Sequence, residues 1–563
     1  MTTLLGPPLS EAEGIGALTL GAFLAEVAGR YADSEALVFD DPLNGGQTVR
    51  WTYRDLADQA SSVARALVAS EVEKGARVGI LMGNRPEAVA SVFGAAMAGA
   101  VAVPLSTFSS PSELAFLVAH ADLQVLLTQT SLRGHDFVSD LRALVPGLAE
   151  GGARGLEDPA FPCLRTVTAV GLPATTGAIL AWSDFLAGGG EGADDPIPAR
   201  QAAVLPSDHA VVIYSSGTTD RPKGMLHCHQ AVTLQFWLQA RVFGRGPSTR
   251  LWTALPMFWT AGLNTALGPT LAGGGCWVMQ ESFEPGEAIA LLARERVTEP
   301  YTLPHQTAAL AEHPDWAGAD LSGLRCVFGK SAFARHPSVS GDTSWNSPVA
   351  YGLSETASVF AAHPWDTPRE VMRTSTGRLL PGNRLRVIDP ETGTTLGPGQ
   401  DGELAVAGPT LMEHYVKKTT DECFDADGFF HTGDAGHYDS EGNLHWTGRR
   451  SEMIKTAGAN VSPAELEVAL RAFGPLKLAR VIGVPDARLG QLVVLAAVVK
   501  EGSSATAEEV RAFLRERVSA YKVPREIVFF ADGEVPMTGS DTKVRDADLL
   551  KLVQDRLARE GTR

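Results

Sequence analysis

The sequence has few cysteines and a deficit of positive charge. Its 563 residues include five cysteines, an odd number, and no two of them form a Cys-x-x-Cys pair. This usage disfavours a disulfide framework and a structural zinc site, and it predicts a reducing, cytoplasmic location. The 48 Lys and Arg residues against 65 Asp and Glu residues give a net charge of −17. Nucleic-acid binding proteins need a basic surface, so this balance argues against nucleic acid as a partner.

A membrane-spanning segment is also missing from the pattern. The first 20 residues contain no Lys or Arg, and no signal-like apolar segment precedes the rest of the chain. Two long uncharged stretches, 88–112 and 251–280, contain proline and many Gly, Ser or Thr residues. A membrane helix is typically a run of about 20 residues dominated by Leu and Ile, so we expect both stretches to be buried core and no membrane span.

The N-terminal part alternates between helix and strand patterns. Residues 51–67 place apolar side chains at helical spacing, a helix is predicted at 86–98, and apolar strands are predicted at 77–82 and 101–105. Strands that alternate with helices predict a parallel sheet with helices on both faces. The alternation continues through apolar segments at 123–128, 209–216 and 324–329. The Gly/Pro/Ala-rich segment 151–200 is predicted to be a surface excursion.

The C-terminal part has a different texture. Residues 383–408 are predicted to form an antiparallel β unit, because two strand patterns flank a turn-rich segment. From about residue 447, predicted helices at 463–473 and 507–518 mix with strand patterns. The predicted strands lie at 479–486, 493–500 and 526–530. The fold class is therefore α/β, with a large N-terminal region of doubly wound layers plus a β unit, followed by a small α+β domain.

The strongest single motif is YSSGTTDRPKG, residues 214–224, which follows an apolar strand. Such a loop can offer backbone N–H groups, hydroxyls and one ammonium to a polyphosphate. Its candidate phosphate-binding residues are Ser215, Ser216, Gly217, Thr218, Thr219 and Lys223. It is not a Walker A loop, because Pro222 replaces the second glycine and Gly224 stands where a Ser or Thr would bind magnesium. Taken alone, the loop also fits a surface loop rich in Ser, Thr and Gly.

This loop resembles the signature loop of the class I adenylate-forming (ANL) superfamily, in its acyl-CoA synthetase branch. Other segments resemble family blocks in family order: YGLSETAS (351–358), GELAVAG (402–408), FFHTGDAGHYDSEGNLHWTGRR (429–450), IKTAGANVSPAELE (454–467), VIGVPDARLG (481–490) and YKVP (521–524). The resemblance implies a reaction in two halves. A carboxylate first reacts with ATP to give acyl-AMP and pyrophosphate, and a thiol, usually of coenzyme A, then takes the acyl group.

The resemblance also implies roles for individual residues around the nucleotide. Glu355 would hold Mg²⁺, which prefers hard oxygen ligands, and Ser354 would face the α-phosphate. Tyr351, followed by Gly352, would lie against adenine. On the residues alone, this segment also fits a turn with a solvated glutamate.

Two further residues are implied at the ribose. Asp434 would accept hydrogen bonds from both ribose hydroxyls, since an ionised carboxylate is an acceptor only, and Arg449 would also reach the ribose. The alternatives are that Asp434 caps a turn and that Arg449 belongs to a solvated basic pair.

The C-terminal segment would supply a lysine, a hinge and a thiol face. Lys543 resembles the catalytic lysine that bridges the attacking carboxylate and the α-phosphate, although it lies seven residues after Pro536, where the family usually has six. The alternative is a solvated surface lysine. Ser451 stands at the hinge between an N-terminal domain, 1–448, and a small mobile domain, 451–563. Gly458 would lie in the loop that faces the thiol.

The acyl site is predicted to be apolar. The segment PMFWTAG, 256–262, has no acidic residue to hold an ammonium group, which disfavours α-amino acids. The candidate lining residues are Phe236, Trp237, Trp259, Gly262, Phe328 and Phe333. Fatty, aromatic and polycyclic acids all stay open. His227, Cys228 and His229 lack the spacing of a metal site, so a buried helix start is favoured there.

The leading hypothesis is an AMP-forming acyl-CoA ligase that uses ATP, Mg²⁺ and coenzyme A on an apolar carboxylic acid. The first alternative is an enzyme that makes acyl-AMP and passes the acyl group to an acyl carrier protein or a separate transferase. The second is a nucleotide- or acyl-binding homologue without catalysis. The resemblance leaves a homodimer open.

Overall fold

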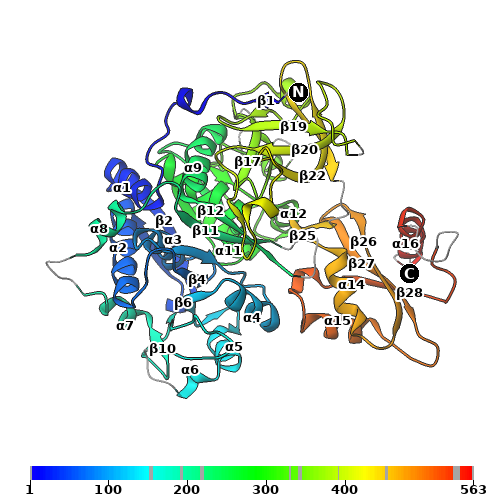
Figure 1. Cartoon of the computed structure of the whole chain (residues 1–563), viewed down its shortest axis with the longest axis horizontal. Coiled ribbons are helices and arrows are strands. Elements are labelled where there is room, and N and C mark those ends of the chain that lie inside the picture. Colours follow the sequence, from blue (N-terminus) through cyan, green and yellow to red (C-terminus); the bar gives the residue numbers. More distant parts are fainter. Residues whose placement is uncertain are drawn as a thin grey trace.

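The computed structural model describes residues 3–150, 156–190, 195–215, 221–328, 331–339, 345–390, 392–449, 454–536 and 546–560. Figure 1 shows a large N-terminal part, blue to yellow, and a smaller C-terminal part, orange to red, at its side. The helix α16 (Asp546–Glu560) lies on the far side of the C-terminal part.

An eight-stranded sheet forms the first layer of the N-terminal part. Across the sheet its strands are β10 (Ile179–Ala181), β9 (Thr166–Val170), β6 (Leu123–Gln129), β4 (Arg77–Leu81), β5 (Val101–Pro104), β11 (His209–Ser215), β12 (Lys223–Cys228) and β21 (His414–Tyr415). The pairs from β10 to β11 are parallel and the last two are antiparallel. The predicted parallel sheet is confirmed. The prediction for 151–200 is wrong in part, because β9 and β10 come from this segment and extend the sheet.

A second, five-stranded sheet carries the strands β15 (Glu299–Pro300), β13 (Arg250–Thr253), β14 (Cys276–Met279), β2 (Glu35–Asp41) and β3 (Gln47–Thr52). The strand predicted at 324–329 is absent from the described residues of that segment, 324–328. The N–H groups of Arg325 and Cys326 both donate to the single carbonyl of Thr298, so the segment makes no ladder with β15.

Helices pack between the two sheets and form the main core with them (Figure 1). They are α1 (Leu20–Tyr31), α2 (Tyr53–Ala69), α3 (Pro86–Met97), α9 (His229–Phe243) and α10 (Gly268–Ala272). Almost every residue of α3 is buried, which explains why its residues 88–97 belong to an uncharged stretch. Gly94 lets α3 approach α2, since a Cβ there would lie 2.8 Å from the carbonyl oxygen of Ala60.

Other helices cover the outer faces of both sheets, so the fold is doubly wound as predicted. The eight-stranded sheet carries α4 (Pro111–His120), α5 (Phe137–Leu144) and α6 (Gly147–Glu150), and the five-stranded sheet carries α11 (Pro285–Arg294) and α12 (Pro304–Glu312). Side chains alternate between the faces: Val125 and Leu127 join the main core, and Leu126 joins the outer one. Within the described ranges, no helix is long and apolar enough to cross a membrane.

The predicted antiparallel β unit is confirmed. Its sheet contains β1 (Leu4–Leu5), β19 (Arg384–Ile388), β20 (Gly402–Ala407), β22 (Phe430–Tyr438) and β23 (Leu444–Arg449). Beside it, β16 (Val349–Leu353), β17 (Ser358–His363) and β18 (Arg378–Leu379) form a three-stranded sheet. Shorter elements include α7 (Trp182–Ala187), α8 (Ile197–Ala202), α13 (Arg369–Met372), the hairpin β7 (Ser131–Leu132) and β8 (His135–Asp136), and the π-helix η3 (Ala261–Leu267).

The C-terminal part has cores of its own on both faces of one sheet. The strands are β24 (Ile454–Thr456), β25 (Ala459–Val461), β26 (Leu476–Asp486), β27 (Gly490–Val499) and β28 (Glu526–Phe530). The helices α14 (Pro463–Arg471) and α15 (Ala507–Arg515) cover one face, and α16 covers the other. The predicted α+β domain is confirmed, and its exact bounds stay a prediction.

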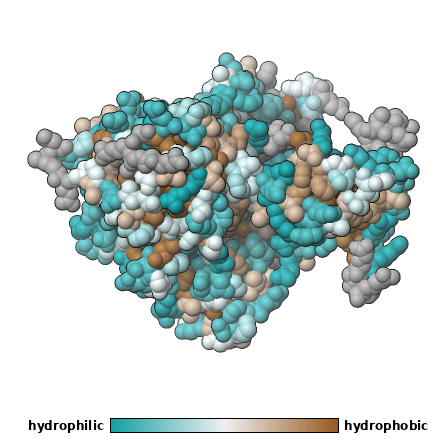
Figure 2. Space-filling view, turned by 90° about the horizontal axis from the view of Figure 1, so that it is seen from below, coloured by the Kyte–Doolittle hydropathy of each residue, from teal (hydrophilic) through white to brown (hydrophobic). Residues whose placement is uncertain are grey.

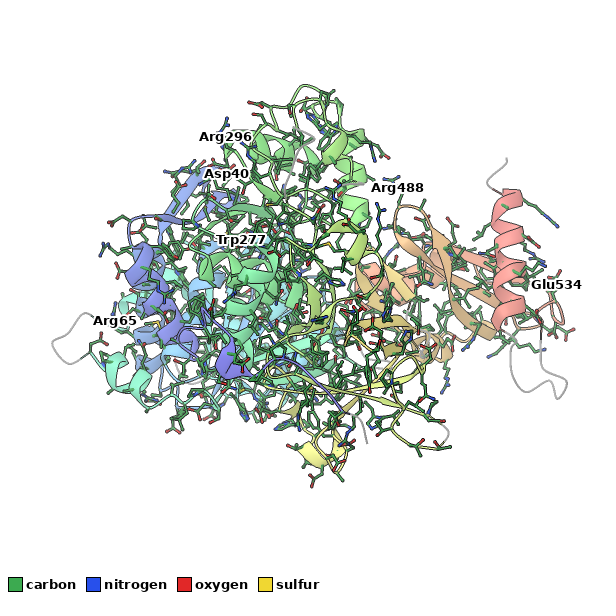
Figure 3. All side chains as sticks on the ribbon, turned by 90° about the horizontal axis from the view of Figure 1, so that it is seen from above. Asp40, Arg65, Trp277, Arg296, Arg488 and Glu534 are labelled. Carbon is green, nitrogen blue, oxygen red and sulfur yellow. The ribbon has the colours of Figure 1, made fainter. Side chains whose placement is uncertain are left out.

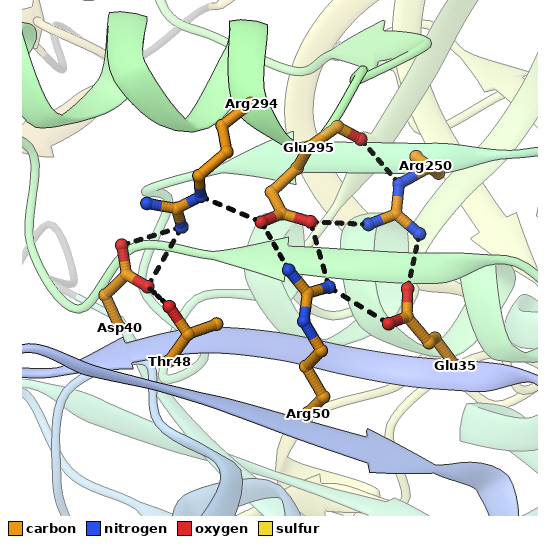
Figure 4. Close-up of polar contacts among 7 residues, drawn as sticks. All are labelled: Glu35, Asp40, Thr48, Arg50, Arg250, Arg294 and Glu295. Atoms are coloured by element: carbon orange, nitrogen blue, oxygen red, sulfur yellow. Dashed lines mark hydrogen bonds and ion pairs between the residues drawn. The ribbon is translucent and has the colours of Figure 1, made fainter.

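A network of charges fastens α11 to the five-stranded sheet (Figure 4). The buried Glu295, directly after α11, accepts hydrogen bonds from Arg50 at 2.7 Å, Arg250 at 2.9 Å and Arg294 at 3.0 Å. Glu35 pairs with the first two of these arginines. The network therefore joins β2, β3, β13 and α11 at one point.

The surface and the junction of the two parts can be followed in two further views. On the face shown in Figure 2, hydrophobic residues are scattered in small groups among hydrophilic ones.

Figure 3 shows Trp277 inside the N-terminal part and Arg488 at the side of the C-terminal part that faces the N-terminal part. Arg488 lies 3.4 Å from Glu312 at the end of α12, so this ion pair crosses the junction.

Candidate functional site

The phosphate loop leaves the carboxyl end of β11, the edge at which open α/β sheets bind ligands. Its residues Ser216, Gly217, Thr218 and Thr219 lie outside the described residues. The chain returns along β12, whose register pairs Lys223 with Ser215. Both residues line the same cavity, so the strand pairing brings the ammonium and the hydroxyl of the motif together.

Glu355 belongs to a connected group with Lys223. The hydroxyl of Tyr415 donates to Oε1 of Glu355 at 2.8 Å, and the Lys223 ammonium lies 5.4 Å from the centre of the Tyr415 ring. The backbone carbonyl of Glu355 also accepts from Met412 at 2.7 Å. These contacts fix the carboxylate beside the phosphate loop, and the sequence analysis missed Tyr415.

Asp434 and Tyr351 form a second pair that lines the same cavity. The hydroxyl of Tyr351 donates to Oδ2 of Asp434 at 2.9 Å, and Asp434 is only 2% exposed. Arg449 is the cross-strand partner of Asp434 in the register of β22 and β23, although its side chain lies outside the described set. A buried carboxylate beside an aromatic ring suits a sugar hydroxyl pair and a base.

The turn between β16 and β17 is held in an unusual backbone conformation. Ala357 and Ser358 have φ angles of +55° and +133°. A Cβ on Gly352 would lie 1.7 Å from the carbonyl oxygen of Ser358, so only glycine fits there. Strain of this kind is stored where the surrounding structure enforces it, often at functional sites.

Buried amides behind the turn enforce its shape. Gln235 of α9 donates to the carbonyls of Thr356 at 2.8 Å and Val359 at 2.7 Å. Asn264 of η3 donates to the carbonyl of Ala357 at 2.6 Å. The sequence analysis missed this support, although amide side chains within an apolar helix were a visible signal.

One cavity of about 800 Å³ joins these groups. The predicted site residues that line it are Ser215, Lys223, Tyr351, Gly352, Ser354, Glu355, Asp434 and Phe328. Lys455 of β24 also lines it, with its ammonium 4.7 Å from the centre of the Trp446 ring. The C-terminal part therefore contributes a cation to the cavity that the sequence analysis did not single out.

Most of the predicted acyl-lining residues lie elsewhere. Phe236 is fully buried against Phe23, and Phe333 is buried against Trp316. Trp237 is buried and donates its indole N–H to the carbonyl of Ala17. None of these three lines a described cavity. The aromatic residues predicted the correct helix, α9, but the residue of that helix at the cavity wall is Phe243, two turns after Phe236.

The two remaining acyl candidates lie near the cavities. Gly262 is buried behind the wall, where a Cβ would lie 2.1 Å from the carbonyl oxygen of Pro256. Trp259 lines two smaller cavities, of about 190 Å³ and 340 Å³. Trp259 therefore lines the two cavities that also contain residues of the C-terminal part, and it does not line the large cavity.

The hairpin β24–β25 carries Gly458 into this junction. Gly458 has φ +80° and lines the 190 Å³ cavity, which shares Ser215 and Ser354 with the large one. A Cβ at Gly458 would lie 2.6 Å from Cδ1 of Leu303. The cavity of 340 Å³ lies next to it and is lined by Ala457 and Ala459 of the same hairpin. The three cavities form a series that leads from the domain junction to the large cavity.

A buried lysine ties the C-terminal part to the N-terminal part. Nζ of Lys522, a residue 1% exposed, lies 2.9 Å from Glu113 of α4 and 2.7 Å from Glu465 of α14. The hydroxyl of Ser519 donates to Glu113 at 2.6 Å. Burial alone would lower the pKa of Lys522, but the charges around it raise that pKa, so the cation is retained. The sequence analysis quoted this lysine within YKVP but gave it no role.

Two predicted residues lie outside the described ranges: the lysine Lys543 and the hinge residue Ser451. Their roles therefore stay predictions. No group of three or more His, Cys, Asp or Glu side chains among the described residues could hold a metal ion. Burial lowers the pKa of His227 and of His229 to about 4, so both are neutral core residues, and α9 begins at His229.

Glu355 by itself can serve as the protein ligand of a Mg²⁺ ion that is bound together with the nucleotide. Such an ion usually takes one or two protein carboxylates and completes its shell with phosphate and water. Glu355 is half-buried at the cavity wall, and one of its oxygens already accepts from Tyr415.

The fold and the cavity define a nucleotide-dependent enzyme with two unequal domains. The model of the AMP-binding enzyme family matches residues 24–416, and the model of its C-terminal domain matches residues 465–542. The chain belongs to this family, the adenylate-forming superfamily, in its acyl-CoA synthetase branch.

Individual relatives agree with this assignment. An indoleacetate–CoA ligase of Aromatoleum aromaticum is 31% identical over 515 residues, which cover 91% of this chain and 95% of that protein. The 3-[(3aS,4S,7aS)-7a-methyl-1,5-dioxo-octahydro-1H-inden-4-yl]propanoyl:CoA ligase of Mycobacterium tuberculosis is 31% identical over 520 residues, with 91% and 95% covered. Among solved structures, the amide bond synthetase McbA of Marinactinospora thermotolerans matches with a TM-score of 0.73 and 26% identity, covering 95% of this chain and 99% of that one.

Proposed function

We propose that this chain is an AMP-forming acid–thiol ligase that joins an apolar carboxylic acid to coenzyme A at the expense of ATP. The observation that carries this proposal is one cavity lined by the Tyr351–Asp434 pair, the Glu355–Lys223 group and a set of uncharged, largely apolar side chains. A nucleotide, its phosphates and an acyl group need three such environments in one cavity.

In the first half-reaction, a carboxylate oxygen of the acid attacks the α-phosphorus of ATP. The bond from that phosphorus to the bridging oxygen breaks, and pyrophosphate leaves. Asp434 would hold the ribose and Tyr351 the base, while Lys223 and Ser354 would face the phosphates. When bound by Glu355, Mg²⁺ would supply neutralisation of phosphate charge. Lys543 would stabilise the charge that builds up between the two reactants.

In the second half-reaction, the sulfur of coenzyme A attacks the acyl carbonyl, AMP leaves with the oxygen that it gained, and the thiol proton passes to solvent. The position of the Gly458 hairpin beside the series of cavities supports a route for the thiol through the domain junction. We infer that this arrangement serves the thiol step, and that the C-terminal domain turns at Ser451 to bring Lys543 to the cavity for the first step.

An apolar acid is supported by the walls of the large cavity and by the named substrates of two relatives. Indoleacetate and the indene-derived propanoyl group are both acids with a ring system. The similarity to an amide bond synthetase supports a second candidate, in which acyl-AMP passes to an acceptor other than coenzyme A. An acyl carrier protein as acceptor, a homodimer and a cytoplasmic location stay predictions.

The test is pyrophosphate release from MgATP with a panel of apolar acids, with and without coenzyme A, with products identified by mass. The ligase predicts AMP and an acyl-CoA thioester that form only when both acid and coenzyme A are present. Acyl-AMP that persists despite coenzyme A would favour the second candidate. Bound ATP without turnover on any acid would contradict both.

A further inference from the structure

One part of the lining of the large cavity is free of charged side chains, and we call this part its apolar end. It consists of Phe243, Thr260, Thr265, Tyr301, Phe328, Pro348, Ser358 and Val359. Three are aromatic, three carry aliphatic hydroxyls, and none carries a charge. This end suits a ring, which packs edge-to-face against other rings, together with a polar group that accepts or donates a hydrogen bond.

Two of the hydroxyls form a pair across elements that are distant in the sequence. Oγ1 of Thr265, on η3, lies 2.8 Å from Oγ of Ser358, at the start of β17. Each hydroxyl can donate once and accept twice, so the pair uses one hydrogen internally and keeps one donor hydrogen and several lone pairs for a third group. Ser358 is half-buried and lines the cavity, and its φ of +133° fixes its position.

An aromatic wall stands beside this pair. The backbone carbonyl of Thr265 accepts from Arg245, and the Arg245 guanidinium lies 4.6 Å from the centre of the Phe243 ring. Phe243 contacts Tyr301 edge-to-face at 6.4 Å. The Tyr301 hydroxyl makes no hydrogen bond to any described residue, and burial raises the pKa of this phenol, so it stays a neutral donor.

The charge of Arg245, which lies over the Phe243 ring, is already neutralised. Arg245 donates three hydrogen bonds to Glu299, of 2.6 Å, 2.9 Å and 3.2 Å, and the side chains of both residues are buried. An arginine enclosed in this way offers no free charge to a ligand. A second carboxylate or an ammonium on the acid would therefore lose water without finding a partner at this end.

Resting on the proposed function, we propose that the Thr265–Ser358 hydroxyl pair determines substrate specificity. It selects a ring-bearing carboxylic acid whose far end carries one uncharged hydrogen-bonding substituent, such as a phenolic hydroxyl or a ring carbonyl. A plain hydrocarbon at this end would bury the hydroxyl pair without using its remaining donor. A site built to hydrogen-bond a substrate group discriminates against the analogue that lacks it.

The experiment measures kcat/KM for pyrophosphate release with matched acids. The probes are phenylacetic, 3-phenylpropanoic and cinnamic acids, their 4-hydroxy and 4-carboxy derivatives, and octanoic acid. We expect the best 4-hydroxy acid to exceed its unsubstituted parent by about tenfold, the effect of one net hydrogen bond, and to exceed the 4-carboxy acid and octanoic acid by more. Thr265→Val and Ser358→Ala should each bring the hydroxy-to-parent ratio to within about twofold, by slowing the hydroxylated acid alone.

Thr270→Val is the matched control. Thr270 is fully buried on α10, its hydroxyl donates to the carbonyl of Ala266 at 2.7 Å, and it lines none of the three cavities described above. This variant should lower the Tm as much as Thr265→Val does and leave the hydroxy-to-parent ratio unchanged. A wild-type ratio near one, a preference for octanoic or 4-carboxy acids, or an equal loss on all acids in Thr265→Val would overturn the inference while leaving the ligase intact. Absence of pyrophosphate with every acid would instead contradict the proposed function.

Discussion

At the scale of single residues, the site contains a few positions where the charge or the size of the side chain is critical. Asp434 is buried and shares a hydrogen bond with Tyr351, and Gly352 lies against the backbone of Ser358. Asp434 and Gly352 make different predictions. Asp434 contributes a negative charge, whereas Gly352 is required because a larger side chain would collide with the backbone.

Asp434→Ala should raise the KM for ATP and lower kcat/KM by about 100-fold, because two ribose hydroxyls lose a charged acceptor worth roughly 1.5–3 kcal/mol. Tyr351→Phe keeps the ring and removes only its hydroxyl, so its effect should stay below about fivefold. Steady-state kinetics with ATP varied gives both values. Asp401→Ala, which removes an exposed acid that pairs with His437, is the control and should match wild type. Equal losses in Asp434→Ala and Asp401→Ala would refute the ribose assignment.

Gly352→Ala should abolish pyrophosphate release and lower the free energy of unfolding. The added Cβ would lie 1.7 Å from a backbone oxygen, so the turn that carries Ser354 and Glu355 must move. Gly246→Ala is the matched control, since nothing lies within 4 Å of a Cβ there. Turnover and a urea titration of both variants test this. Normal activity in Gly352→Ala would show that the turn has another shape in solution.

At the scale of elements, buried polar groups hold the site in shape. Gln235→Leu removes two hydrogen bonds to the turn between β16 and β17, so two buried carbonyls lose their side-chain donor. We expect a loss of about 2–4 kcal/mol in the free energy of unfolding, together with a lower kcat. Gln230→Leu lies on the same helix at a half-buried position and should change stability by less than about 0.5 kcal/mol. Equal stability of the two variants in denaturant would contradict this role of α9.

The charge network around Glu295 predicts a pH-dependent stability. Burial would raise the pKa of Glu295, but hydrogen bonds from Arg50 and Arg294 outweigh it and lower the pKa. A lowered pKa means that the stabilisation is present above the pKa of the unfolded chain and is lost as the pH falls through the folded value. Glu295→Gln should therefore cost about 2–4 kcal/mol at pH 7, and the difference from wild type should shrink toward pH 3.

The control for this network is Glu312→Gln, which breaks only the exposed pair with Arg488 and should cost less than about 0.5 kcal/mol. Urea titrations at several pH values measure both variants. A Glu295→Gln difference that grows as the pH falls would have the wrong sign for this account.

The sequence predicted the elements better than the walls of the site. Period-two and helical patterns, together with turn residues, placed most strands and helices, since burial on one face leaves a periodic trace. The strand predicted at 324–329 was wrong because hydrophobicity alone does not provide a neighbouring strand edge. The acyl-lining role predicted for Phe236 was not found because a pattern shows which face of a helix is buried, and not where along the helix a cavity begins. The amides Gln235 and Asn264 are recognisable as supports only once their partner carbonyls are known.

At the scale of the whole molecule, Lys522 links the two domains in the observed arrangement. It pairs with Glu113 in the N-terminal part and with Glu465 in its own domain. The series of cavities and the Gly458 hairpin could not be predicted from sequence patterns, because they depend on how the domains meet. The family blocks did predict that the small domain would carry such a face.

Glu113→Gln should weaken this arrangement without removing the acceptor that caps α4. If the arrangement serves the thiol step, thioester formation from preformed acyl-AMP should slow by about tenfold while pyrophosphate release changes less than about twofold. Rapid-quench measurements separate the two steps. The control is Glu516→Gln, which changes an exposed acid whose side chain pairs with Arg517 and whose backbone carbonyl accepts from Ser112 of α4. Slowing of both steps by the same factor would contradict a role in domain orientation.

The most direct test of the central claim follows one oxygen atom. The acid is supplied with both carboxyl oxygens as ¹⁸O, together with MgATP and coenzyme A, and the products are weighed by mass spectrometry. Because the carboxylate itself attacks the α-phosphorus, the account predicts AMP that carries one ¹⁸O and an acyl-CoA thioester that retains the other. Unlabelled AMP, or label in pyrophosphate or in inorganic phosphate formed with ADP, would contradict it.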